Sequence, residues 1–190
     1  MSSILLCGVG GQGAVLASRI LAQAAMDRGY FARTAETIGM AQRGGCVVSH
    51  VRFGGDTASP LIPLGGADAI VASEPCEAVR NRGYLKPGGL VVTSPDAISP
   101  VTASLSGARF DGRAMIEYMA RHADVRVIDT QALMRECGSL KPLNIALIGC
   151  AVQHGQLGID LADVERALRA RVAPRYVEMN LKALALGRDS

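Results

Sequence analysis

The glycine-rich turn "CGVGGQG", residues 7–13, constrains the fold more than any other stretch of the chain. It follows the apolar run "SILLC" and precedes "AVLASRILAQAAMDRG", in which polar residues recur at every fourth position on one stripe. A short apolar run, a glycine turn and an amphipathic helix are typical of the first strand and helix of a nucleotide-binding α/β sheet. We therefore predict a strand at residues 3–7 and a helix from residue 14 that stops at Gly29.

The rest of the chain alternates between strand and helix patterns. Further strands are expected at residues 30–35, 46–53, 69–73, 90–94 and 125–129. Helices are expected between the strands at 69–73 and 90–94, ending in the turn "LKPGG", and at 111–122, 130–137, 142–156, 160–171 and 174–187. The alternation predicts a Rossmann-like α/β fold with a mostly parallel sheet, helices on both faces and a helical C-terminal segment. No linker or repeat interrupts it, so residues 1–190 are expected to form one domain.

Composition and charge argue against several classes of protein. The formal net charge is +3, the basic residues are scattered, and aromatic residues make up only 4% of the chain. Nucleic-acid binders usually gather Lys and Arg on one face, so this pattern predicts no nucleic-acid partner. No apolar run approaches about 18 residues, and no basic leader precedes one. We therefore expect a cytoplasmic protein with no membrane span.

The five cysteines are far apart in sequence and form no CxxC pair. Zinc sites and iron–sulfur clusters are usually built from closely spaced ligands, so neither is expected on this chain. The three histidines are equally scattered, and we expect no metal. Four of the five cysteines have apolar sequence neighbours, which predicts buried free thiols in a reducing compartment. The cysteines are Cys7, Cys46, Cys76, Cys137 and Cys150.

Two functions are open for the glycine turn. Its candidate anion-binding residues are Gly8, Gly10, Gly11, Gln12 and Gly13, and the glycines fit the GxGxxG pattern between a strand and a helix. The alternative is a turn that serves only close packing. A dinucleotide site also requires an acidic residue at the end of the second strand, where Glu36 is the candidate, yet the long "TIGMAQRGG" follows it instead of a short ribose-binding turn. The turn lacks GK[ST] and is not a Walker A loop.

The stretch "AETIGMAQRGGCVVSHVRFGG", residues 35–55, combines charged groups with glycines that allow close backbone approach. Its candidate substrate-, coenzyme A- or partner-facing residues are Glu36, Gln42, Arg43, Gly44, Gly45 and Arg52. On the strand at 46–53, alternation places His50 and Arg52 on one face. Glu36 or Glu74 are plausible partners for them. The simpler interpretation is an internal ion pair for Arg52 and a satisfied buried imidazole for His50.

Several stretches together resemble a known family. They are "GVGGQGAVLASRILAQAA", "AETIGMAQRGGCVVSHVRFG", "ADAIVASEPCEAVR", "YLKPGGLVVTS", "LNIALIGCA" and "EMNLKALALG", and they run from residue 8 to residue 187. In combination they resemble the γ-type subunits and domains of 2-oxoacid:ferredoxin oxidoreductases. The stretch "ETIGMAQRGG" resembles the β (small) subunits of the indolepyruvate branch.

This resemblance implies a chain without a catalytic residue of its own, in a complex that converts an aryl pyruvate and coenzyme A to aryl-acetyl-CoA, CO2 and reduced ferredoxin. It implies that thiamine diphosphate, magnesium and the [4Fe–4S] clusters belong to a large α subunit, with ferredoxin engaged through the complex. A contact between two copies of the chain is also plausible. Residues 36–52 would then face the partner's thiamine site, with Arg43 near the substrate or the phosphates of coenzyme A.

Two other functions stay open from the residues alone. One is a stand-alone Rossmann-type enzyme that binds NAD(P) or S-adenosylmethionine; "YLKPGGLVVTS" suits the latter, although Pro-Gly-Gly before a strand is equally a generic turn. The other is a regulatory module that binds acyl-CoA or a nucleotide without catalysis.

Overall fold

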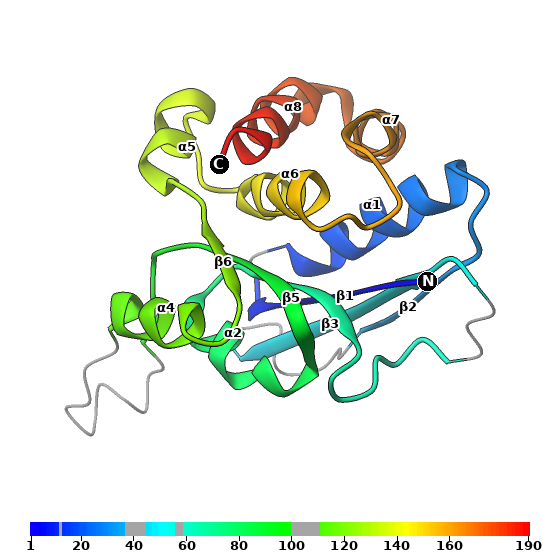
Figure 1. The fold of residues 1–190 in the computed structure, drawn as a ribbon. Coiled ribbons are helices and arrows are strands. Elements are labelled where there is room, and N and C mark those ends of the chain that lie inside the picture. Colours follow the sequence, from blue (N-terminus) through cyan, green and yellow to red (C-terminus); the bar gives the residue numbers. More distant parts are fainter. Residues whose placement is uncertain (12, 37–44, 56–58, 100–110) are drawn as a thin grey trace.

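A six-stranded mixed sheet runs through the molecule in the order β2-β3-β1-β4-β5-β6 (Figure 1). The computed structural model describes residues 1–11, 13–36, 45–55, 59–99 and 111–190. The strands are β1 (Ser2–Val9), β2 (Ala32–Glu36), β3 (Cys46–Phe53), β4 (Ala67–Ala72), β5 (Leu85–Thr93) and β6 (Asp124–Val127). The helices are α1 (Ala14–Asp27), α2 (Pro75–Arg80), the 3-10 turn η2 (Arg82–Tyr84), α4 (Gly112–Ala120), α5 (Thr130–Cys137), α6 (Leu143–His154), α7 (Leu161–Arg171) and α8 (Pro174–Arg188).

The strands β1, β4, β5 and β6 are parallel, which confirms the expected mostly parallel α/β sheet. The strand β3 runs antiparallel to both of its neighbours, β1 and β2. The second strand of the chain is therefore at the sheet edge and makes no contact with the first strand through backbone hydrogen bonds.

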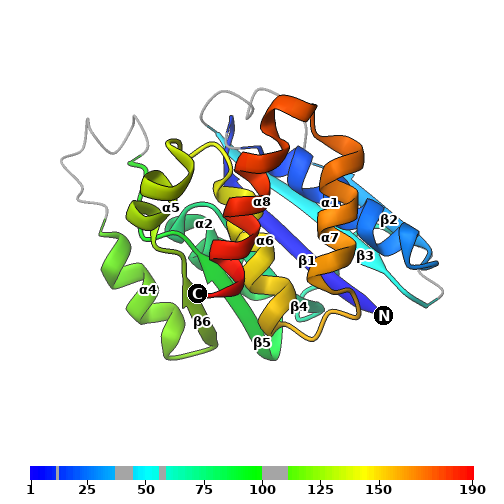
Figure 2. The same cartoon turned by 90° about the horizontal axis from the view of Figure 1, so that it is seen from above.

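Helices cover both faces of the sheet (Figures 1 and 2). On one face α1 and α6 pack against the strands, and α7 and α8 lie over them; on the other face lie α2 and α4. Successive residues of β1 enter the two cores, with Leu6 in the cluster under α1 and α6 and Leu5 in the cluster under α2 and α4. A strand covered on both faces is apolar at every position, which explains the continuous run "SILLC".

Two expectations from the sequence are wrong in detail. The stretch "LKPGG" belongs to β5 and not to a turn, because a register irregularity places Ala67 opposite Leu85 and Ala69 opposite Leu90. Gly88 has φ +73°, a conformation suited to glycine in such a bulge.

The thiols are also less buried than expected. Cys7 and Cys150 are buried, Cys76 and Cys137 are partly exposed, and Cys46 is exposed. None of the described helices is long and apolar enough to span a bilayer.

Two glycines allow α8 to lie close against α6. A Cβ built at Gly187 of α8 would lie 1.9 Å from the backbone oxygen of Ala146 in α6. A Cβ at Gly149 of α6 would lie 2.5 Å from the backbone oxygen of Leu184 in α8. No side chain fits between backbones at these separations, so the position of α8 over α6 requires glycine at both points.

We predict that Gly187→Ala lowers the free energy of unfolding by about 1–3 kcal/mol, because the added methyl group must push α8 away from α6. Urea unfolding followed by circular dichroism measures the change. Lys182→Ala, an exposed substitution on the same helix, is the control and should stay within about 0.5 kcal/mol of the parent. A Gly187→Ala protein as stable as the parent would show that the helix crossing is not tight.

Candidate functional site

A groove of about 490 Å³ lies at the carboxyl ends of β1, β4 and β5. The helix that follows β1 packs on one face of the sheet and the helix that follows β4 packs on the other. In an open α/β sheet such a reversal leaves a crevice beyond the strand ends, where ligands usually bind. The groove is lined by Gly11, Gly13, Ser73, Ser94, Asp96, Ile98, Leu140, Lys141 and Leu143.

The glycine turn forms one wall of this groove. Gly11 has φ +98° and Gly13 has φ +84°, conformations that residues with a Cβ rarely adopt. Gly13 is the N-cap of α1, and no side chain caps that end of the helix or supplies an acidic group in its first turn. The amide groups at the start of α1 can therefore donate to an anion or to a polar group of a partner.

The same turn is joined to the start of β3. The backbone N–H of Gly10 donates to the carbonyl oxygen of Gly45 over 2.8 Å, and Gly8 pairs with Val47 within the sheet. A second hollow of about 310 Å³ lies between the turn, the start of α1 and Val47. Gly45, a candidate from residues 35–55, is therefore close to the glycine turn. Gln12 lies outside the described residues.

Glu36 is not in the groove. It ends β2, at the sheet edge beyond β3, and its Oε1 accepts a hydrogen bond of 2.7 Å from the hydroxyl of Ser18 in α1. A dinucleotide site needs the acidic residue on a strand next to β1, whereas β3 occupies that position here. The geometry therefore does not support Glu36 as a ribose ligand.

Arg52 is at the opposite end of the sheet from the glycine turn. Its guanidinium donates to the backbone oxygens of Ser59 at 2.9 Å and Leu61 at 3.0 Å, and it also contacts Ser3. The suggestion that Glu36 or Glu74 pairs with Arg52 is wrong, because within the described residues the guanidinium binds backbone carbonyls and forms no ion pair. The candidates Gln42, Arg43 and Gly44 lie outside the described residues.

Several groove residues were not singled out from the sequence. Ser73 and Ser94 follow β4 and β5, and the Ser94 hydroxyl donates to the Ser73 carbonyl oxygen over 2.9 Å. Asp96 and Lys141 add one charge of each sign from loops. The serines that close the apolar runs "AIVAS" and "LVVTS" were a usable signal, because carboxyl ends of neighbouring parallel strands meet at one edge. No pattern in the sequence around Lys141 indicated that this residue lies in the groove.

The described lining of the groove is suited to binding a ligand and lacks a nucleophile with an adjacent base. Its described lining residues include no histidine and no cysteine, and the Ser94 hydroxyl is directed to a carbonyl oxygen instead of a base. A serine nucleophile needs an adjacent general base. The residues described here therefore offer backbone donors, hydroxyls and one lysine to a ligand or a partner chain.

His50 is a satisfied core histidine, as the simpler interpretation predicted. It is buried, its Nδ1 accepts from the backbone N–H of Ile62 over 3.2 Å, and its ring meets the Tyr84 ring edge-on. Burial lowers the pKa of His50 below its ordinary value of 6.5. The neutral imidazole is thus the form that the fold requires.

We predict that stability falls as pH drops below about 6.5 because of His50. The unfolded chain binds a proton at this residue near pH 6.5, whereas the folded chain resists it, so the unfolded state holds more protons between the two pKa values. The stability that neutral His50 contributes is fully present above pH 6.5. It is lost as the pH falls from 6.5 toward the lower pKa of His50 in the folded chain. Urea unfolding at pH 7.5 and 5.5 measures this loss. In His50→Asn, which keeps an acceptor but cannot titrate, the difference between the two pH values should shrink; an unchanged difference would exclude His50.

We predict that Gly13→Ala lowers the free energy of unfolding by about 1–2 kcal/mol, because alanine is strained at positive φ. A Cβ at Gly13 has adequate room, with its nearest neighbour, Asn144 Nδ2, at 3.7 Å. Gly13→Asn is the matched variant and should lose less, since asparagine tolerates this conformation better. Urea unfolding of both proteins tests the explanation, which an equal loss in the two would contradict.

Comparison with known proteins extends over almost the whole chain. The family described as pyruvate ferredoxin/flavodoxin oxidoreductase matches residues 3–190. The chain is 39% identical to the indolepyruvate oxidoreductase subunit IorB of Archaeoglobus fulgidus, over 97% of this chain and 92% of that protein. It is 37% identical to the subunit of the same name from Pyrococcus horikoshii, over 97% and 93%.

A solved structure agrees with these sequences. The γ subunit of a keto/oxoacid ferredoxin oxidoreductase from Geobacter sulfurreducens superposes with a TM-score of 0.71 at 25% identity, covering 100% of this chain and 97% of that one. Fold, length and sequence lead to one assignment. The chain belongs to the pyruvate ferredoxin/flavodoxin oxidoreductase family.

Proposed function

We propose that the chain is the small subunit of a thiamine-dependent 2-oxoacid:ferredoxin oxidoreductase that acts on indolepyruvate or a related aryl pyruvate. The assembled enzyme would produce aryl-acetyl-CoA, CO2 and reduced ferredoxin. Whole-length similarity to two subunits named for indolepyruvate oxidoreductase carries this proposal. Residues 1–190 would act as one γ-type domain.

The cofactors are proposed to reside on a large α subunit, with coenzyme A as co-substrate. An iron–sulfur cluster is usually held by four cysteine thiolates. In the described structure Cys150 lies in the core under α1 and α6, whereas Cys7 lies in the core on the other face of the sheet. This division does not suit a four-cysteine cluster within the chain. The described lining of the groove likewise offers binding groups, with neither the histidine nor the cysteine that often serves in acid–base or nucleophilic catalysis.

The groove and the adjoining glycine turn are the proposed surface toward the large subunit and coenzyme A. Backbone amides at the start of α1, together with Lys141, are suited to phosphate or carboxylate groups. Arg43, which lies outside the described residues, follows Glu36 by seven positions and precedes Gly45, whose carbonyl is bonded to the glycine turn. The short sequence distance from Arg43 to Gly45, which is bonded to the turn, supports a role for this side chain at the same surface.

A stand-alone NAD(P) enzyme is less well supported. It would require an acidic residue beside the glycine turn on the strand next to β1, and β3 carries Cys46, Val47 and Val48 there instead. No observation favours a separate regulatory module.

We predict that aryl-pyruvate- and coenzyme A-dependent dye reduction appears only when this chain is co-expressed anaerobically with its large subunit. Each subunit expressed alone should be inactive. Indolepyruvate and pyruvate, compared in the same assay, test the substrate class. Activity of the large subunit without this chain, or pyruvate turned over faster than any aryl pyruvate, would contradict the proposal.

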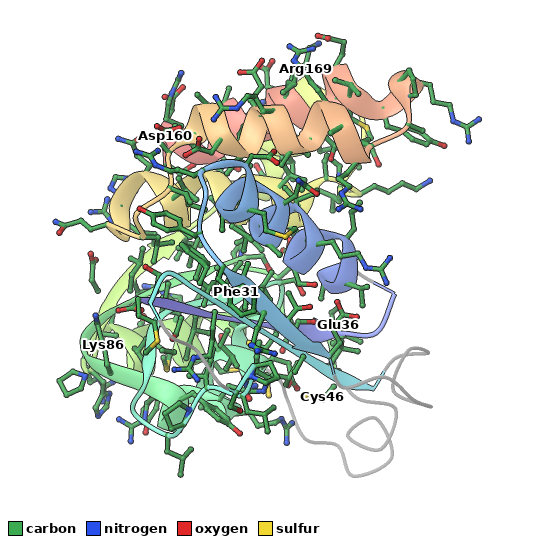
Figure 3. All side chains as sticks on the ribbon, turned by 90° about the vertical axis from the view of Figure 1, so that its right-hand side faces the viewer. Phe31, Glu36, Cys46, Lys86, Asp160 and Arg169 are labelled. Atoms are coloured by element: carbon green, nitrogen blue, oxygen red, sulfur yellow. The ribbon has the colours of Figure 1, made fainter. Side chains whose placement is uncertain are left out.

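Within that complex, Arg43→Ala and Lys141→Ala should each lower kcat/KM for coenzyme A or the aryl pyruvate by about tenfold or more, since a charge-assisted hydrogen bond contributes about 1.5–3 kcal/mol. Lys86→Ala is the matched control. Lys86 pairs with Asp68 at the start of β5, at the opposite end of the strands from Glu36 and Cys46 (Figure 3). Variants of Arg43 and Lys141 that assemble and turn over like Lys86→Ala would remove both residues from the site.

A further inference from the structure

A cluster of thiols and carboxylates lies beneath the start of β3, outside the groove. Cys46 opens β3, and Glu74, Cys76 and Glu77 lie at the start of α2. The antiparallel pairing of β3 with β1 turns Cys46 toward the sheet face that α2 covers, the same face that holds Cys7. Residues from two separate parts of the chain thereby meet at one point. Figure 3 shows Cys46 at the same end of the strands as Glu36, the last residue of β2.

The donor atoms of this cluster converge. One carboxylate oxygen each from Glu74 and Glu77 and the Sγ of Cys76 all lie within 4.8 Å of one another. The Sγ of Cys46 is 2.6 Å from Glu77 Oε2. Three donors, two carboxylates and one thiol, therefore surround one small volume, and Cys46 adjoins them through Glu77.

The cluster also carries buried negative charge. Glu74 is only 1% exposed and Glu77 only 5%, yet among the described residues Arg80 alone lies within ion-pair distance of the two, at 3.1 Å from Glu77 Oε1. Glu74 accepts from the backbone N–H groups of Glu77 and Ile98. Two buried carboxylates with one guanidinium leave a site that favours a further positive charge.

In the protein as described, the Cys46 thiol donates to the Glu77 carboxylate. A bound cation would displace the thiol proton, because thiolates are the form in which cysteine binds metal.

We propose that Glu74, Cys76 and Glu77, joined by Cys46 once its side chain rotates toward them, bind one thiophilic divalent cation of the zinc class. Zinc accepts cysteine sulfur at about 2.3 Å and carboxylate oxygen at about 2.0–2.2 Å in a tetrahedral arrangement, which sets sulfur and oxygen ligands about 3.5 Å apart. Cys46 Sγ must therefore move away from Glu77 by roughly 1 Å, and the exposed position of Cys46 leaves its side chain room to rotate. Magnesium and calcium prefer all-oxygen ligands and fit this donor set poorly.

The ion would connect two elements that the sheet does not join. The described contact between β3 and α2 at this end is the hydrogen bond from Cys46 to Glu77. Cys46 follows Gly45, whose carbonyl is held by the glycine turn. A metal at Cys46 would therefore fix the start of β3 beside that turn. This inference does not depend on the substrate or the partner proposed above.

We predict that the full chain, purified without a histidine tag, reduced and stripped of metal, takes up one equivalent of Zn²⁺ in equilibrium dialysis and unfolds at a higher temperature with it. Co²⁺ should give the intense thiolate-to-metal charge-transfer absorption and the visible bands of a tetrahedral site. Absence of uptake, or Co²⁺ bound without a charge-transfer band, would overturn the proposal.

Cys46→Ser and Cys76→Ser should each weaken Zn²⁺ binding by at least about tenfold, as even the loss of outer-shell partners does in metal sites. Cys137→Ser, which removes a partly exposed thiol elsewhere, is the matched control and should bind like the parent. Glu77→Gln, which keeps the shape of the side chain, should also weaken binding. Circular dichroism verifies that each variant is folded. Binding by the Cys46→Ser/Cys76→Ser double variant at the parent's affinity would rule the site out.

Discussion

The antiparallel ladder between β1 and β3 is the constraint on which the rest of the structure depends. It pairs Ser2 with Phe53 at one end and Val9 with Cys46 at the other, over the full length of both strands. Because β3 takes the place beside β1, the second strand moves out to the sheet edge and carries Glu36 with it. The ladder also brings the start of β3 to the glycine turn, where the carbonyl of Gly45 accepts from the N–H of Gly10.

The position of the groove follows from the helices that surround that ladder. The helix α1 leaves β1 toward one face and α2 leaves β4 toward the other, so the strand ends between them stay uncovered. Backbone amides at a glycine N-cap line this opening, together with strand-end serines and the single lysine Lys141. Such a surface suits a subunit that completes a site formed mainly by a partner, which is the role proposed for this chain.

The chain's two chemically distinctive regions adjoin the same stretch. The groove uses the glycine turn on one side of β1, and the thiol–carboxylate cluster lies under Cys46 on the face covered by α2. The glycine turn binds Gly45, and the cluster binds Cys46, the next residue. A cation bound in the cluster would therefore act on the segment that adjoins one wall of the groove.

The sequence by itself determined the α/β class, the positions of the strands and most helices, and the glycine turn between β1 and α1, because these depend on local periodicity and backbone sterics. The tertiary structure decided which residues each candidate side chain contacts. Strand order moved Glu36 away from the turn, directed Arg52 to loop carbonyls, and joined Cys46 to Glu77 across 31 positions. Spacing along the chain could not show these contacts, since the direction of β3 is set by pairing energy and packing over the whole sheet, and by no local pattern.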